Sequence, residues 1–236
     1  MNITTRALTV IVDLAGVLIP AESMLQGMRQ LFQLHTNKEP TLEQIKQATA
    51  HSKPKHIANI MHLLNVPNSS LPRLLSHYDK VQLNYFQQHP PTLLPGTLDA
   101  VSHFQSRIVV TSMFPPSIFE FIMENLRRQG LLADASFCCT SELLTRERMI
   151  ESGKILFPAK RNVFFADTCQ DFESTKNCPN LLRVGVTNHS SEPMSGLEAR
   201  LIQAGAHVTV PTLNSARRDW ILEQCQRYSG SFSNGW

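Results

Sequence analysis

Three aspartates in this 236-residue chain lie where strands of a sheet are expected to end. Asp13 closes an apolar, β-branched run that begins at Leu8, and Asp167 closes another run that begins at Val163. Asp171 follows Asp167 in a D-x-x-x-D spacing. Because ligands of a parallel α/β sheet bind at the carboxyl ends of its strands, we expect these acids to converge at one edge of the sheet.

Carboxylates held together in this way need a proton or a cation between them. At a separation of ~4 Å and an effective dielectric constant of ~20, each pair would repel by ~4 kcal/mol. Mg²⁺ fits the expected cluster, because it is a hard cation that works with one or two carboxylates and a substrate phosphate. An aspartate carboxylate can also attack phosphorus directly and form an aspartyl-phosphate. The three acids therefore predict Mg²⁺-dependent phosphoryl transfer.

Alternating strands and helices are expected to position the acids. The expected strands cover residues 8–13, 107–112, 136–139, 163–167, 182–187 and 207–210. The expected helices between them begin at residue 97 or cover residues 117–128, 145–152, 171–177, 196–204 and 214–228. This alternation implies right-handed crossovers and an α/β fold with a doubly wound parallel sheet.

A block of helices interrupts this pattern after the first strand. Helices are expected around residues 22–35, after Thr41 with Gln44 as its capping partner, after Ser52 with Pro54 in the first turn, and after Ser70. The breaker-rich residues 89–96 form the return linker. The sequence thus predicts a core of residues 1–20 and 92–228, an inserted helical cap of residues 21–91, and a disordered tail of residues 229–236.

The composition excludes several other classes of function. The net charge is only +3 and the basic pairs are scattered, which argues against nucleic-acid binding. No apolar run approaches the ~18 residues that a membrane span needs, so no membrane partner is expected. The five cysteines are odd in number and lack a CxxC spacing, which favours a reducing cytoplasm. The nine histidines show no zinc-binding spacing.

In their order along the chain, these motifs resemble the haloacid dehalogenase superfamily of phosphotransferases, and within it the phosphonoacetaldehyde hydrolases. The stretch from Asp13 to Gly16 is similar to their D-x-A-G-T motif, with Val17 in place of the threonine. Residues 109–112 resemble the second motif, and residues 165–168 with Asp171 resemble the acidic motif. The resemblance implies a Rossmann-like sheet with an inserted helical cap, and it also allows a homodimer formed through the cap.

The resemblance assigns roles to individual residues. Asp13 is implied as the nucleophile, and the Mg²⁺ ligands are implied to be Asp13, Asp167, Asp171 and the backbone carbonyl of Ala15. Ser112 is implied to hydrogen-bond the phosphoryl oxygens, with Thr111 as the alternative.

The basic residue of the third motif is harder to place. Ungapped counting puts it on Glu147, which carries an arginine on either side. We therefore favour Arg148, with Arg146 and Lys154 as alternatives.

Two departures from the family concern the leaving group. Ala15 stands where most of the superfamily has its acid/base aspartate, as in phosphonoacetaldehyde hydrolases. Asn59 stands where the resemblance places the Schiff-base lysine, and an amide cannot form an imine. Because general acid assistance is worth roughly 10²–10⁴-fold, an ordinary alkyl phosphate is expected to be a poor substrate. Lys55 and His62 lie on the same helical face as Asn59 and could compensate.

Three hypotheses follow. The first is a hydrolase of a small phosphorylated or phosphonylated metabolite with Mg²⁺ as cofactor. The second is a catalytically inactive protein that binds a phosphate ligand, which the departures at Val17, Asn59 and Glu147 favour. The third keeps phosphonoacetaldehyde as the substrate and uses Lys55 to form the imine.

Overall fold

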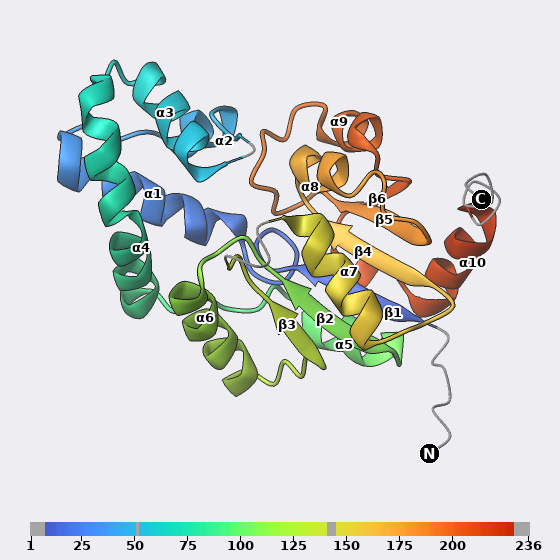
Figure 1. The fold of residues 1–236 in the computed structure, drawn as a ribbon. Helices are drawn as coiled ribbons and strands as arrows, with labels where there is room; N and C mark the ends of the chain where they lie inside the picture. Colours follow the sequence, from blue (N-terminus) through green and yellow to red (C-terminus); the bar gives the residue numbers. More distant parts are fainter. Residues whose placement is uncertain (1–7, 51, 141–144, 229–236) are drawn as a thin grey trace.

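The computed structural model describes residues 8–50, 52–140 and 145–228, which contain a six-stranded parallel sheet with helices on both faces (Figure 1). The strands are β1 (Thr9–Asp13), β2 (Arg107–Thr111), β3 (Ala135–Phe137), β4 (Asn162–Ala166), β5 (Leu181–Val186) and β6 (Val208–Val210). Their order in the sheet is β3-β2-β1-β4-β5-β6. The predicted doubly wound α/β fold is confirmed, and each expected strand is present. The expected disordered tail lies outside the described residues.

Alternate residues of the central strands face opposite layers of helices, as expected for strands buried on both faces. Val10 and Val12 pack into a cluster with residues of α5 (Thr97–Phe104), α6 (Pro116–Arg128) and α10 (Arg218–Tyr228). Ile11 packs on the other face with residues of α7 (Arg146–Leu156), α8 (Cys169–Ser174) and α9 (Leu197–Ala204). The sheet is therefore covered by helices on both sides.

The helices between β1 and α5 build a second hydrophobic cluster of their own. These are α1 (Ala21–Thr36), α2 (Leu42–Gln47), α3 (Lys53–Leu63), the short 3₁₀ turn η1 (Asn68–Ser70) and α4 (Leu71–Gln88), and we call them the cap. Thr41 and Gln44 form the expected capping box at the start of α2. Ser52 caps α3, with Pro54 in its first turn. Within the described part of the chain, no helix is both long enough and apolar enough to span a membrane.

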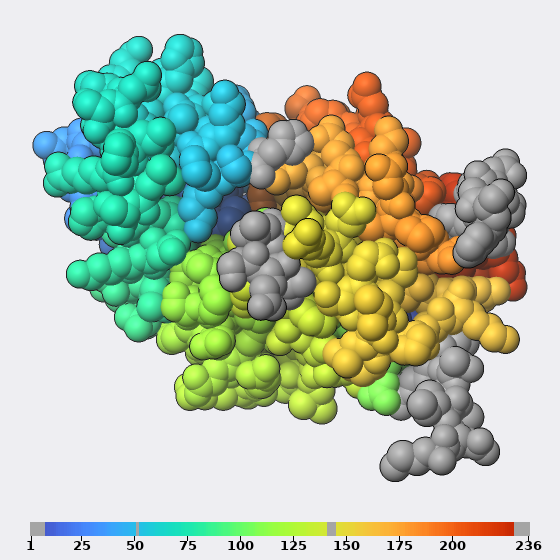
Figure 2. Space-filling view, viewed as in Figure 1, coloured from blue at the N-terminus to red at the C-terminus, as the bar shows by residue number. Residues whose placement is uncertain are grey.

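Two neighbouring strands, β1 and β4, define the edge at which a ligand can bind. The chain leaves β1 for β2 on one side, and later returns to β4 on the other side. In this register Val12 lies beside Phe165, so both strands end at the same level of the sheet. Such a switch point is where open α/β sheets bind their ligands. Figure 2 shows a hollow between the cyan cap and the yellow and orange helices of the core, with blue atoms from the start of the chain at its bottom.

Candidate active site

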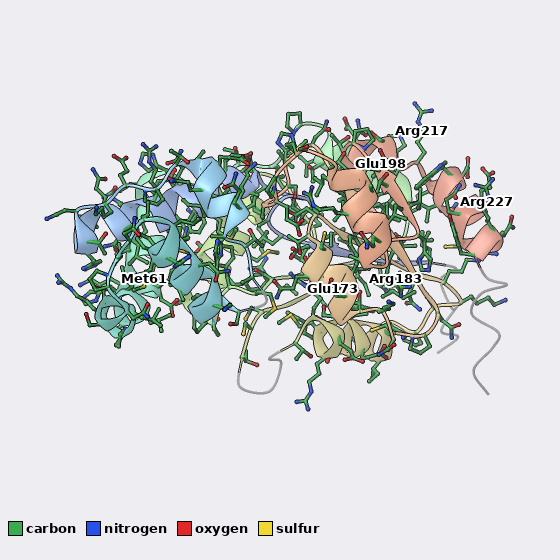
Figure 3. The ribbon with its side chains drawn as sticks, turned by 90° about the horizontal axis from the view of Figure 1, so that it is seen from above. Met61, Glu173, Arg183, Glu198, Arg217 and Arg227 are labelled. Atoms are coloured by element: carbon green, nitrogen blue, oxygen red, sulfur yellow. The ribbon has the colours of Figure 1, made fainter. Side chains whose placement is uncertain are left out.

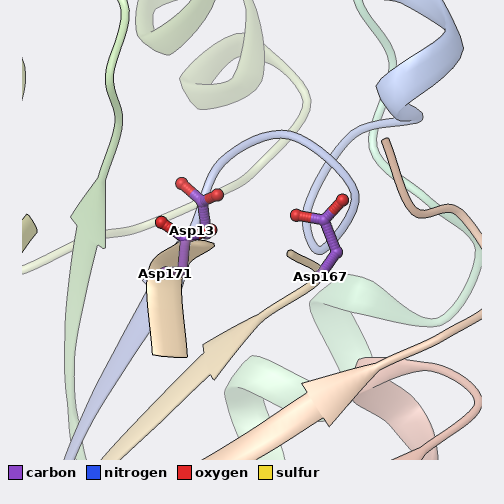
Figure 4. Close-up of side chains that lie close together, drawn as sticks. All are labelled: Asp13, Asp167 and Asp171. Atoms are coloured by element: carbon purple, nitrogen blue, oxygen red, sulfur yellow. The ribbon is translucent and has the colours of Figure 1, made fainter. Parts of the chain in front are cut away.

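Three buried carboxylates meet at the switch point (Figure 4). Asp13 is the last residue of β1, Asp167 directly follows β4, and Asp171 lies in the first turn of α8. One carboxylate oxygen from each aspartate can be chosen so that all three lie within 4.8 Å of one another. The structure thus brings together the acids that the sequence expects at this edge.

Local hydrogen bonds fix the two acids beyond β4. The Thr168 hydroxyl caps α8 by accepting the backbone N–H of Asp171, and it donates to Asp171 Oδ2 at 2.7 Å. The backbone N–H of Ser191 donates to Asp167 Oδ2 at 2.7 Å. Both carboxylates are therefore held in place before any ligand binds.

Glycine is required in the turn after β1. Gly16 has a φ of +77°, which side-chain-bearing residues rarely adopt. A Cβ built on Gly16 would lie 2.3 Å from the carboxylate carbon of Asp167. The glycine of the D-x-A-G stretch thus lets this turn pack directly against the acid cluster.

A buried arginine neutralises part of the cluster. Arg146 is only 5% exposed, and its Nη2 lies 2.8 Å from Asp13 Oδ1 while its Nε donates to Asp171 Oδ1 at 2.8 Å. Its Nη1 donates to the Thr111 hydroxyl at 3.0 Å. One guanidinium group thus ties the end of β1, the end of β2 and the start of α8 together.

Burial and mutual repulsion raise the proton affinity of the acids. Burial raises the pKa of Asp13 to about 7, although Arg146 opposes this shift. Burial, together with the charges of Asp13 and Asp171, raises the pKa of Asp167 well above its usual range. Burial alone would lower the pKa of Arg146, but the neighbouring aspartates raise it above its usual value, so the guanidinium stays charged. Three acids facing one arginine leave an excess of negative charge that a cation would relieve.

The cluster also contains a carboxylate oxygen that could serve as a metal ligand. Asp167 Oδ1 is buried and has no hydrogen-bond partner among the described residues. A buried charged oxygen without a partner is costly, and hard oxygen donors are the ligands that Mg²⁺ prefers. The donor set therefore fits a magnesium ion.

Magnesium is expected to stabilise the folded protein. At 10 mM Mg²⁺ and a dissociation constant of about 0.1–1 mM, the melting temperature should rise by about 3–10 °C, because only the folded chain presents the three acids together. Thermal melts with and without Mg²⁺ measure this shift. Asp167→Asn should lose most of it. Asp99→Asn, which changes an exposed aspartate on α5, should keep it. An equal shift in both variants would contradict the assignment.

The remaining residues of the predicted phosphoryl site lie next to the cluster. Ser112 directly follows β2 and is buried, and its hydroxyl accepts the backbone N–H of Phe114 at 3.1 Å. Thr111, the alternative, donates to the backbone carbonyl of Val12 and accepts from Arg146. Ala15 lies half-buried in the turn after β1. Among the described hydrogen bonds, Thr111 therefore contacts Arg146 and Ser112 does not.

Among the basic residues considered for the third motif, Arg146 is the one beside the acids. Arg148 is exposed, on a different face of α7. Lys154 bonds Glu151 at 2.7 Å and the backbone carbonyl of Pro179 at 2.9 Å. The structure therefore places Arg146, the alternative, against Asp13, and not Arg148, the residue favoured from the sequence.

The cap residues expected to assist the leaving group are not brought to the acids. Lys55 and His62 are both exposed on α3, and neither is a partner of the acid cluster in the described contacts. The Asn59 amide donates to the backbone carbonyl of Ala48 at 3.0 Å, which holds α3 against the end of α2. Within the described residues, the cap reaches the site's surroundings through Thr49, whose hydroxyl donates to the Ser191 carbonyl at 3.4 Å.

Sequence patterns alone assign no role to the loop that holds Asp167. Residues 190–192 lie between β5 and α9 and are all buried although all are polar. A short polar run in a loop carries no periodic signal, so only the fold reveals its partners.

Comparison with known proteins agrees with the fold. Neither a protein-family model nor a curated protein sequence matches the chain. Among solved structures, a phosphonoacetaldehyde hydrolase-like protein of Oleispira antarctica has a TM-score of 0.79 at 14% identity, over 94% of this chain and 93% of its own. A haloacid dehalogenase-like protein of Agrobacterium tumefaciens has a TM-score of 0.74 at 16% identity, over 92% and 98% of the two chains.

A third solved structure extends the comparison to another enzyme. β-Phosphoglucomutase of Clostridium difficile has a TM-score of 0.66 at 14% identity, over 94% of this chain and 98% of its own. At such low identity these likenesses concern the fold, which is the one shared by haloacid dehalogenase-like hydrolases.

Proposed function

We propose that the protein is a Mg²⁺-dependent hydrolase of a small phosphorylated or phosphonylated metabolite, acting through an aspartyl-phosphate on Asp13. The observation that carries this proposal is the buried cluster of three aspartates with its one arginine at the switch point. In this proposal residues 1–20 and 92–228 form the catalytic core, and residues 21–91 form a cap that selects the substrate and excludes water.

The chain's own residues supply the first step. Asp13 attacks the phosphorus, so that an oxygen–phosphorus bond to the aspartate forms as the bond to the leaving group breaks. Arg146 holds the attacking carboxylate in place and keeps a positive charge beside it. Ser112, which directly follows β2, is proposed to donate to a phosphoryl oxygen, because the proton of the alternative hydroxyl, that of Thr111, already goes to the Val12 carbonyl.

The metal would be held by Asp13, Asp167, Asp171 and the carbonyl of Ala15. When bound, Mg²⁺ neutralises charge that develops on the transferred phosphoryl group. In the second step water attacks the phosphorus of the aspartyl-phosphate, releasing inorganic phosphate and restoring the Asp13 carboxylate.

The leaving group sets the expected substrate class. Ala15 carries no acid, and Lys55 and His62 are exposed, so none of these three residues is placed to protonate a departing oxygen. The first step therefore favours groups that leave without a proton, such as the carboxylate of an acyl phosphate or a stabilised carbanion.

A panel of phosphate compounds tests this function. We expect Mg²⁺-dependent phosphate release from an acyl phosphate or an aryl phosphate, roughly 10²–10⁴-fold faster than from an alkyl phosphate such as glycerol phosphate. Chelation of the metal should abolish the release. Equal rates for alkyl and acyl phosphates would reveal a general acid that the proposed site lacks.

A second candidate is a protein that binds a phosphate ligand without turnover. The observation that favours it is the same lack of leaving-group assistance at Ala15 and on α3. Calorimetry distinguishes the two functions: saturable, Mg²⁺-dependent binding of phosphate compounds, with no phosphate released from any of the panel, would support the binding protein.

A further inference from the structure

The loop between β5 and α9 is unusual because it buries three polar residues in a row. Ser190, Ser191 and Glu192 are all at most 8% exposed. Buried polar groups are normally retained only where they are hydrogen-bonded. Their partners therefore indicate what the loop does.

The loop's hydrogen bonds converge on the segment that carries two of the three acids. The backbone N–H of Ser191 donates to Asp167 Oδ2 at 2.7 Å, and the Ser190 hydroxyl donates to the Asp167 carbonyl at 2.7 Å. The same hydroxyl accepts the backbone N–H of Glu192 at 3.0 Å, which closes the turn of the loop. The loop thus binds both the side chain and the main chain of Asp167.

Glu192 connects the loop to the start of α8 through hydrogen bonds. Its Oε1 accepts the backbone N–H of Cys169 at 2.6 Å, and its Oε2 accepts the Cys169 thiol at 3.1 Å. Cys169 lies between Asp167 and Asp171, so this contact anchors the stretch of chain that joins the two acids. Arg200 forms an ion pair with Glu192, with its Nε 3.7 Å from Oε2. Glu192 is thus buried at 8% exposure with both carboxylate oxygens committed to Cys169, so its contacts are made to the start of α8.

We propose that Ser190 and Glu192 are positioning residues that hold Asp167 and the first turn of α8 in the arrangement that binds the metal. This inference rests on the proposed magnesium site. Asp167 Oδ2 accepts the Ser191 N–H. The other carboxylate oxygen, Oδ1, has no partner among the described residues and is available to a metal. Partners that orient a ligand in this way are typically worth 10–100-fold in metal affinity.

The dissociation constant for Mg²⁺, measured by isothermal titration calorimetry, tests the proposal without any substrate. Ser190→Ala and Glu192→Ala should each weaken Mg²⁺ binding by about 10–100-fold. Glu192→Gln should recover most of the affinity, because its amide oxygen still accepts the Cys169 N–H. Glu198→Ala is the matched control: Glu198 lies on α9, the next helix (Figure 3), and accepts from the Thr209 hydroxyl at 2.8 Å. It should bind Mg²⁺ as the unchanged protein does.

The outcomes separate this inference from the proposed function. If the unchanged protein binds Mg²⁺ and both alanine variants bind it equally well, the positioning role is wrong while the metal site stands. If the unchanged protein binds no Mg²⁺, the metal site fails and the inference fails with it. If Glu192→Ala does not fold, Ser190→Ala, which removes a single hydroxyl, decides the question by itself.

Discussion

Asp13→Asn should abolish phosphate release, with a fall of roughly 10³-fold or more in turnover. The reason is chemical: an amide oxygen is a far weaker nucleophile than a carboxylate, and it cannot form the aspartyl-phosphate. The substitution changes almost nothing in size. Its remaining oxygen can still accept the backbone N–H of Leu14, which lies 2.8 Å from Asp13 Oδ1.

The same substitution should not lower the melting temperature in metal-free buffer. Asp13, Asp167 and Asp171 face a single arginine, so removing one negative charge relieves repulsion, while the ion pair with Arg146 becomes a hydrogen bond to a neutral amide oxygen. Phosphate release and thermal melts, measured on the same preparation, check both parts. A variant that releases phosphate at the rate of the unchanged protein would remove Asp13 from the mechanism.

Arg146→Met should have the second largest effect, on stability as well as on activity. It leaves the buried acids without their cation, and breaking a buried ion pair from one side costs about 3–5 kcal/mol. For a domain of this size that corresponds to a fall of roughly 6–20 °C in the melting temperature without metal. Turnover should fall by roughly 10²–10³-fold, because Asp13 loses the group that orients it and the site loses a charge preorganised for the transition state.

Mg²⁺ and a second variant make this prediction specific. Part of the lost stability should return in Mg²⁺, since the ion replaces the missing positive charge. Arg148→Met removes the exposed arginine two residues further along α7, and its melting temperature and turnover should change little. A loss of turnover in Arg148→Met with none in Arg146→Met would give the role in the third motif to Arg148.

The acids could be predicted from the sequence because strand ends are well marked. An apolar run that stops at a carboxylate, as at Asp13 and Asp167, defines both the strand and its edge. Because the strands of such a sheet are parallel, their carboxyl ends lie at the same edge, regardless of the segments that connect them. The cap was predictable for a similar reason, since its helices begin at caps such as Thr41 and Ser52.

The choice between Arg146 and Arg148 depends on which face of α7 points toward the acids, and counting residues along the motif does not show this. Two residues along a helix correspond to a turn of about 200°, so neighbouring arginines face different sides. A signal was present in the spacing: Arg146 shares the buried face with Met149, Ile150 and Gly153, at intervals of three and four residues. Helical periodicity would have favoured Arg146, whereas ungapped counting fell on Glu147 and left the choice between the arginines beside it open.

The cap side chains were the least predictable part of the site. Lys55, Asn59 and His62 share one helical face, as their spacing requires, but which way that face points depends on how α3 packs. The buried residues of α3, Ile57, Ile60 and Met61, belong to the cap's own cluster. Packing inside the cap therefore decides the orientation of α3, and the position of its polar face relative to the acids follows only from the fold.

Phosphate found on Asp13 would test the central claim most directly. The protein is mixed with a ³²P-labelled acyl phosphate and Mg²⁺, quenched in acid within a single turnover, digested and mapped by mass spectrometry. We predict label on the peptide that contains Asp13, dependent on Mg²⁺ and missing from Asp13→Asn. Label on any other residue, or phosphate release with no labelled enzyme at any time point, would contradict the account.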